Sequence, residues 1–155
     1  MIEDYLSSKN SSENLKIFDF HRLWYNNCTW GIKVYKHIEE YLRAFLNEKS
    51  EIFDIRNIHL LWEHKKCMAL RIKYLIDNKY LSNNQIYYDY SNIEKDAFIL
   101  RNLALKYALN SKKSIIENAI ILLKTIEENE SKALMLLASA FDNQLEQRGI
   151  KRKDI

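Results

Sequence analysis

The chain has 155 residues, of which 47% are hydrophobic and 29% are charged, and its formal net charge is +3. It has no proline and two glycines, Gly31 and Gly149, which excludes glycine-rich dinucleotide and phosphate loops and the glycine-flanked nucleophile elbow. Hairpin turns also depend on glycine and proline, and dedicated nucleic-acid-binding proteins carry more positive charge. We therefore predict an all-α fold, a single-domain antiparallel helical bundle of about five helices joined by short turns.

Residues 1–11 are predicted to form a flexible lead, residues 12–149 the bundle domain, and residues 150–155 a basic tail. The polar and acidic start lacks the basic and apolar regions of a signal peptide. No apolar run reaches the length of roughly 20 residues that spans a bilayer, and two cysteines are too few for a disulfide framework. We expect a cytoplasmic protein with no membrane association.

Apolar residues recur at intervals of three and four in the first half of the chain, which is the period of a helix. This spacing predicts a first helix over residues 20–45, with a kink or break between Asn26 and Gly31. A second helix is predicted over residues 52–79. Its apolar stripe is interrupted once, at Lys65 and Lys66.

The second half of the chain contains two sequences of the capping-box form, in which a serine precedes a glutamate by three residues. They begin at Ser91 and Ser114, whereas residues 81–90 show no clear period. Gly149 is a typical residue for the end of a helix. The predicted helices cover about 92–110, 115–128 and 131–148.

Two segments of this half are similar to each other. Leu100-x-x-Leu103-Ala104-x-x-Tyr107 is repeated 34 residues later as Leu134-x-x-Leu137-Ala138-x-x-Phe141. The pattern resembles the first helix of a tetratricopeptide repeat, and the resemblance implies a groove for a partner's peptide. It covers residues 97–141, and it departs from the family at Ile116, where a small residue is expected, and at Glu128, where a proline is expected. Two ordinary helices separated by a third would give the same spacing.

Histidines and glutamates of the first two predicted helices form the candidate polar or metal cluster. If these helices pair as antiparallel neighbours, His37 and His64 fall at the same level. Imidazole and carboxylate ligands suit zinc and iron, whereas a hydrogen-bonded pair of interface histidines is the structural alternative. His59 and Glu63, four residues apart, are the acid–base candidates, and a solvated ion pair is their alternative. The cluster consists of His37, Glu40, His59, Glu63 and His64, and we assign no metal, no catalytic residue and no cofactor.

The segment Arg56-Asn57-Ile58-His59 resembles the Arg-Asn…His motif of the HEPN ribonucleases, which are all-helical proteins. The resemblance implies that Arg56 and His59 flank an RNA phosphate. The chain departs from the family here, because the family places more residues between its arginine and its histidine.

Ten tyrosines and three tryptophans are many for this length. Tyrosine and tryptophan are favoured at protein interfaces and also stack on nucleic-acid bases, although large rings fill a bundle core equally well. The tyrosines near residue 88 and the basic residues near the C-terminus are the candidates for binding a partner. They are Tyr87, Tyr88, Tyr90, Arg148, Lys151, Arg152 and Lys153.

The absence of a recognisable site motif favours a non-catalytic helical protein that acts by protein–protein contact, as an adaptor, an inhibitor or a regulatory subunit. One alternative is a nucleic-acid-binding protein that uses lysines and tyrosine stacking. Another is a metal-dependent or acid–base enzyme that uses the histidine and glutamate cluster. We expect a protein partner and leave nucleic acid and a homodimer open.

Overall fold

The computed structural model describes residues 2–9, 29–47 and 52–147. These residues form α-helices, one 3-10 turn and their connections, and they contain no strand. The predicted all-α bundle is therefore confirmed. The elements are α1 (Ile2–Leu6), η4 (Gly31–Lys33), α2 (Val34–Leu46), α3 (Arg56–Asp77), α4 (Gln85–Asn110) and α5 (Lys113–Gln147).

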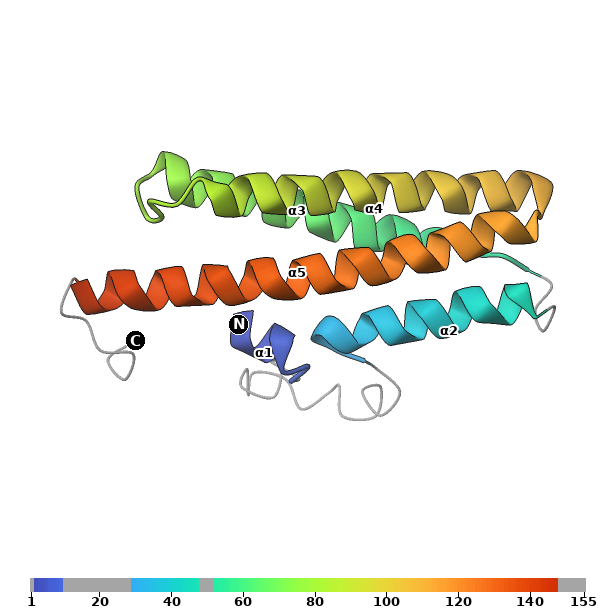
Figure 1. Ribbon diagram of the computed structural model, residues 1–155, viewed down its shortest axis with the longest axis horizontal. Coiled ribbons are helices and arrows are strands. Elements are labelled where there is room, and N and C mark those ends of the chain that lie inside the picture. Colours follow the sequence, from blue (N-terminus) through green and yellow to red (C-terminus); the bar gives the residue numbers. More distant parts are fainter. Residues whose placement is uncertain (1, 10–28, 48–51, 148–155) are drawn as a thin grey trace, which may run out of the picture.

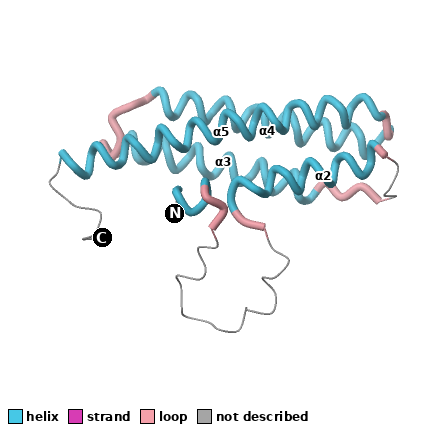
Figure 2. The backbone as a smooth tube through the Cα atoms, turned by 60° about the horizontal axis from the view of Figure 1, so that its bottom comes forward, coloured by secondary structure: helices cyan, strands magenta, loops and turns pink. Residues whose placement is uncertain are grey.

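The three longest helices, α3, α4 and α5, run side by side (Figure 1). Helix α4 packs against both α3 and α5, and the main contact of α2 is with α5. Because α2 is much shorter than α5, it covers only part of the length of the bundle. The short helix α1 lies beside the start of α2 and also contacts α5 (Figures 1 and 2).

Each long helix buries a stripe of residues at intervals of three and four, as the sequence pattern predicts. The stripes are mostly aliphatic, and each includes residues that are almost completely inaccessible to solvent. Two charged residues, Lys65 on α3 and Glu130 on α5, occupy positions in these stripes and are buried with them. The core of the bundle therefore contains a polar centre within an apolar surrounding.

The structure places two helix boundaries differently from the sequence prediction. Ser91 lies inside α4, which begins at Gln85. At the start of this helix the amide of Gln85 donates a hydrogen bond to the side chain of Asn83 at 2.9 Å. Helix α5 continues through residues 128–131, and the hydroxyl of Ser131 donates to the Glu127 carbonyl at 2.8 Å. Since no turn separates the two predicted helices there, the 34-residue spacing does not correspond to a helix-turn-helix repeat.

The N-terminal segment also differs from the flexible lead that its composition predicts. Residues Ile2 to Leu6 form a helix, and Ile2, Tyr5 and Leu6 pack against the core. The predicted helix over 20–45 is described only from Thr29 onward, and its helical part begins at Gly31 with η4 and continues as α2. Its first part and the basic tail lie outside the described residues. None of the described helices is long and apolar enough to cross a membrane.

Substituting Ser111 with glycine is expected to raise the free energy of unfolding by about 0.5–1 kcal/mol. Ser111 ends α4 in the left-handed conformation, with φ at 52°, which glycine adopts without the steric cost of a Cβ. Urea denaturation measures the change. Ser139→Gly, on an exposed position inside α5, is the control, and it should lower the stability because glycine is a poor helix former. A loss of stability in both variants would contradict the prediction.

Candidate functional site

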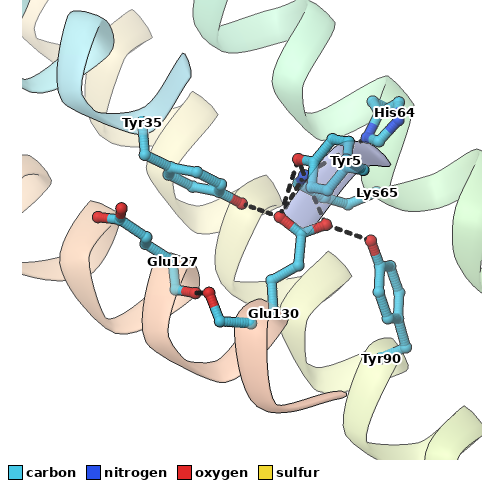
Figure 3. A network of polar contacts seen from close by, with 8 residues as sticks. Tyr5, Tyr35, His64, Lys65, Tyr90, Glu127 and Glu130 are labelled. Carbon is cyan, nitrogen blue, oxygen red and sulfur yellow. Dashed lines mark hydrogen bonds and ion pairs between the residues drawn. The ribbon is translucent and has the colours of Figure 1, made fainter. Parts of the chain in front are cut away.

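A buried ion pair lies at the centre of the bundle. Lys65 and Glu130 are both completely inaccessible to solvent, and Lys65 Nζ lies 2.7 Å from each carboxylate oxygen of Glu130. Three tyrosine hydroxyls converge on the same carboxylate (Figure 3). Tyr35 donates to Oε2 at 2.7 Å, Tyr5 donates to Oε2 at 3.1 Å, and Tyr90 makes a short hydrogen bond to Oε1. We call these five residues the core cluster.

The polar atoms of the core cluster are directed at one another. Lys65 Nζ donates to Glu130 and to the Tyr5 hydroxyl, at 3.1 Å, and lies 3.4 Å from Nδ1 of His64. An ammonium group has three N–H donors, so these acceptors use all of them. Each described α-helix, from α1 to α5, supplies one member of the cluster, in the order Tyr5, Tyr35, Lys65, Tyr90 and Glu130. The cluster therefore holds the helices in one arrangement.

Burial and charge shift the pKa values of the cluster. Burial raises the pKa of Glu130, but the Lys65 cation and the tyrosine hydrogen bonds outweigh it, so the pKa lies below its ordinary value. Burial lowers the pKa of Lys65, and the Glu130 carboxylate opposes this shift. Burial and the negative charge of Glu130 raise the pKa values of Tyr5, Tyr35 and Tyr90. At neutral pH the cluster is an ion pair surrounded by neutral tyrosines.

Helix α1 reaches the core cluster because its backbone at Tyr5 lies very close to Gly31, the first residue of η4. Gly31 has φ at +62°, and a Cβ at this position would lie 2.0 Å from the Tyr5 carbonyl oxygen. The amide of Lys33 donates to the hydroxyl of Ser8 at 3.2 Å. The ring of Tyr5 then stacks on His64, with centroids 5.7 Å apart. One of the two glycines in the chain is therefore required for seating Tyr5 over Lys65.

Substituting Gly31 with alanine is expected to displace α1 and to lower the free energy of unfolding by about 2 kcal/mol. The left-handed conformation alone costs an L-residue roughly 1–2 kcal/mol, and the clash with the Tyr5 carbonyl adds to this cost. Hydrogen exchange at the Ser7 and Lys9 amides, which are bonded to α1 carbonyls, measures the displacement. Ser111→Ala, at the far end of α4, should leave these amides protected. Equal protection in Gly31→Ala and the wild-type protein would contradict the prediction.

Two cavities flank Tyr5, and both are lined by Tyr5, Gly31 and His64. The larger, about 640 Å³, separates α2 from α3 and is called the α2–α3 groove. The smaller, about 380 Å³, lies between α1, α3 and α5 and is called the α1 pocket. The groove walls include Val34, His37, Ile38 and Tyr41 on α2, and Leu60 and Leu61 on α3.

The predicted histidine and glutamate cluster does not assemble. His37 pairs with Glu40 on α2 at 3.2 Å, and His59 pairs with Glu63 on α3 at 3.4 Å. His37 and His64 do line the same groove, on its two walls. Among the described residues, no group of three or more histidine, cysteine, aspartate or glutamate side chains is placed to hold a metal ion. Four of the five candidates therefore form two separate pairs, and His64 instead contacts Tyr5 and Lys65.

The segment that resembles the ribonuclease motif is divided between two contacts. The guanidinium of Arg56 binds the carboxylate of Asp54, with the closest atoms 2.5 Å apart. Nδ1 of His59 accepts a hydrogen bond from Nε of Arg101 on α4 at 2.8 Å. Both side chains are thus engaged away from each other, and the structure does not bring them together around one phosphate position.

The structure separates the three tyrosines that the sequence suggested as a partner-binding patch. Tyr90 is buried in the core cluster, so its assignment to a surface patch is corrected. Tyr87 packs partly against the core, and Tyr88 is exposed. The reason is that α4 already begins at Gln85, which turns Tyr90 inward and Tyr88 outward. The candidates in the tail, Arg148, Lys151, Arg152 and Lys153, lie outside the described residues.

An aromatic and cationic surface occurs on the α3–α4 face. Arg101 lies over the ring of Trp62 at 5.2 Å, and the rings of Trp62 and Phe98 are 5.5 Å apart. The indole N–H of Trp62 donates to Glu94 at 2.8 Å, and Glu63 lies on the same helix as Trp62. The cations Arg101 and Lys66, which both lie over Trp62, are balanced by Glu94 and Glu63, so this face has no excess positive charge for a phosphate backbone.

The core cluster was missed because its members appear in the sequence as ordinary stripe residues. The signal was present, since Lys65 interrupts the stripe of α3 and Glu130 falls on the stripe Ile126, Ala133 and Leu137 of α5. In comparisons with protein-family models, curated proteins and solved structures, no match was found.

Proposed function

We propose that the protein acts by protein–protein contact and binds an amphipathic helix of a partner protein in the α2–α3 groove. The observation that carries this proposal is the open side of the bundle. Helices α2 and α3 pack mainly on α5 and α4, respectively, and a cavity of about 640 Å³ lies between them. A partner helix placed there would give both helices a second neighbour.

The walls of the groove suit a helix. Val34, Ile38 and Tyr41 follow one another at intervals of four and three along α2, and such rows of side chains form the ridges that interlock with an adjacent helix. Leu60 on the opposite wall is 64% exposed, so a partner residue can cover it. An amphipathic helix in an apolar groove between helices is a common mode of recognition.

Helix α1 lies at one end of the groove. It packs against α5 and η4, and its Tyr5 contributes to the groove lining. The hydroxyl of Tyr41 is bonded to the backbone of Asp54 as both donor and acceptor. This fixes the ring of Tyr41, so the wall is preorganised for packing.

The core cluster forms a rigid floor beneath the α2–α3 groove, which supports the same proposed function. Lys65 lines the groove, but its N–H groups are directed at Glu130, Tyr5 and His64. A buried charge with its hydrogen bonds satisfied contributes to a unique packing arrangement in some proteins. A partner can therefore pack against this floor without exposing an unpaired charge. The polar side chains of His37 and Asn57, which also line the groove, can select the orientation of the partner helix.

Site-specific photo-crosslinking tests the proposal. A photoreactive phenylalanine analogue replaces Leu60 in the groove, and a matched variant carries it at Leu109, which is 88% exposed near the end of α4. After irradiation in cells that produce the protein naturally, the crosslinked peptides are identified by mass spectrometry. We expect Leu60 to crosslink reproducibly to one amphipathic helical segment of another protein, and Leu109 to give no such product.

Three outcomes would contradict the proposal. The same products from Leu60 and Leu109 would indicate nonspecific association. Crosslinks from Leu60 to a second copy of this chain would identify self-association as the use of the groove. Crosslinks to a segment without an apolar face would exclude the helix-in-groove mode.

A further inference from the structure

The α1 pocket has an apolar interior formed by two helices of the bundle. Its volume is about 380 Å³, which falls in the range of cavities that bind small molecules. Helix α3 contributes one wall and α5 the other, while α1 covers one side. The apolar lining comes from Met68, Ile72 and Leu75 on α3, and from Leu134, Leu137 and Phe141 on α5.

The pocket also has a cationic edge. Arg71 and Lys9 line it and are exposed, and Asp4 supplies one opposing carboxylate. The Arg71 guanidinium makes a long contact, 3.9 Å, with the sulfur of Met68. Among the described residues, no carboxylate lies within ion-pair distance of Arg71. Within the part of the chain that the structure describes, its planar group of donors is therefore available to an anion at the pocket edge.

The floor of the pocket does not repel an anion strongly. Glu130 lines the pocket, but its charge is balanced by Lys65 at 2.7 Å and its oxygens accept hydrogen bonds from Tyr5, Tyr35 and Tyr90. Burial and the cations of Lys65 and Arg71 keep the pKa of His64 below its ordinary value, despite the opposing effect of Glu130. The polar floor is thus neutral overall, and the uncompensated positive charge lies at the edge.

We infer that the α1 pocket binds a small amphipathic carboxylate, with its alkyl chain between α3 and α5 and its carboxylate on Arg71. The apolar walls account for the chain, because burying apolar surface is favourable. The guanidinium accounts for the headgroup, because its parallel donors match the two oxygens of a carboxylate. The α1 pocket shares Tyr5, Gly31 and His64 with the α2–α3 groove, but Arg71 and the apolar walls between α3 and α5 line the α1 pocket alone. The inference therefore does not depend on the proposed partner.

Isothermal titration calorimetry with three probes of equal chain length tests the inference. Decanoate carries the predicted headgroup, decan-1-ol lacks the charge, and decyltrimethylammonium carries the opposite charge, all below their aggregation concentrations. We expect saturable binding of one decanoate per chain. The affinity for decan-1-ol should be lower by about tenfold, which corresponds to the loss of one charge-assisted hydrogen-bonded pair, and decyltrimethylammonium should bind more weakly still.

Two variants locate the site. Arg71→Gln should weaken decanoate binding by about tenfold and leave decan-1-ol binding unchanged. The matched control is Lys73→Gln, which removes an exposed cation two residues away on α3 whose partner is Asp77, and it should bind decanoate like the wild-type protein. Leu75→Trp fills the pocket and should abolish binding of both probes, with its helical content checked by circular dichroism.

Several outcomes would overturn the inference, and the first does not depend on any variant. Equal affinities for decanoate and decan-1-ol would remove the role of a cationic edge. Equal losses in Arg71→Gln and Lys73→Gln would show general electrostatic attraction. Undiminished binding in a folded Leu75→Trp would place the probe elsewhere, and the absence of saturable decanoate binding would exclude the site.

Discussion

Substituting Lys65 with methionine is expected to lower the free energy of unfolding by about 3–5 kcal/mol, the usual cost of removing one partner from a buried ion pair. The substitution leaves Glu130 charged and completely inaccessible to solvent, with tyrosine hydroxyls as its remaining partners. Urea denaturation followed by circular dichroism measures the change. Lys66→Met is the control, because Lys66 is the next residue on α3 but is exposed. Its ammonium lies over the Trp62 ring at 5.3 Å, so its substitution should lower stability by no more than about 1 kcal/mol.

The double variant Lys65→Met with Glu130→Leu distinguishes the loss of the pair from the loss of packing. Removing both charges should be less destabilising than the sum of the two single changes, because neither charge is then left buried alone. Additive losses would mean that the two side chains stabilise the bundle independently. A Lys65→Met protein as stable as the wild type would contradict the structural role of the cluster.

Raising the pH above about 10 is expected to unfold the protein steeply. The pKa values of Tyr5, Tyr35 and Tyr90 are raised in the folded state, so these hydroxyls keep their protons while the unfolded chain releases them above about pH 10. Their contribution to stability is complete below that pH and is lost as the pH rises toward the folded pKa values. Each tyrosine contributes a slope of about 1.4 kcal/mol per pH unit.

Lys65 acts in the opposite direction over part of the same range. Its pKa is lowered in the folded state, so between the folded and unfolded values a rise in pH favours the folded chain. This offset ends at about pH 10.4, the unfolded pKa of lysine, and above it the three tyrosines together give a loss of about 4 kcal/mol per pH unit.

Parallel titrations check the alkaline prediction. The ultraviolet absorbance of tyrosinate and the circular dichroism of the helices are recorded on the same samples. A final group of tyrosines should ionise only together with the loss of helical signal, and Tyr35→Phe should reduce the pH dependence by about 1.4 kcal/mol per unit. Ionisation of all the tyrosines with the helical signal retained would contradict it.

The period of apolar residues predicted the helices well where a long stripe was present. It placed α3 close to its observed bounds, and the antiparallel register put His37 and His64 on the walls of one groove. Capping boxes were less reliable. The box at Ser114 lies near the start of α5, whereas the box at Ser91 lies inside α4 because the stripe from Ile86 through Tyr90 continues across it.

The core cluster could not be assembled from the sequence. Lys65 and Glu130 are 65 positions apart, and periodicity shows which face of a helix is buried without showing which helices meet. Helix α1 was missed for a different reason. A helix of five residues is unstable alone, and it persists here because Tyr5 reaches the cluster and Gly31 admits its backbone.

The affinity of the partner helix for the groove tests the central claim most directly. A synthetic peptide with the sequence crosslinked from Leu60 is titrated onto the wild-type protein, Leu60→Lys and Leu109→Lys. We predict that Leu60→Lys weakens binding by about tenfold or more, because it places a charge on the apolar wall, and that Leu109→Lys binds like the wild type. Equal affinities for all three proteins would contradict recognition through the α2–α3 groove.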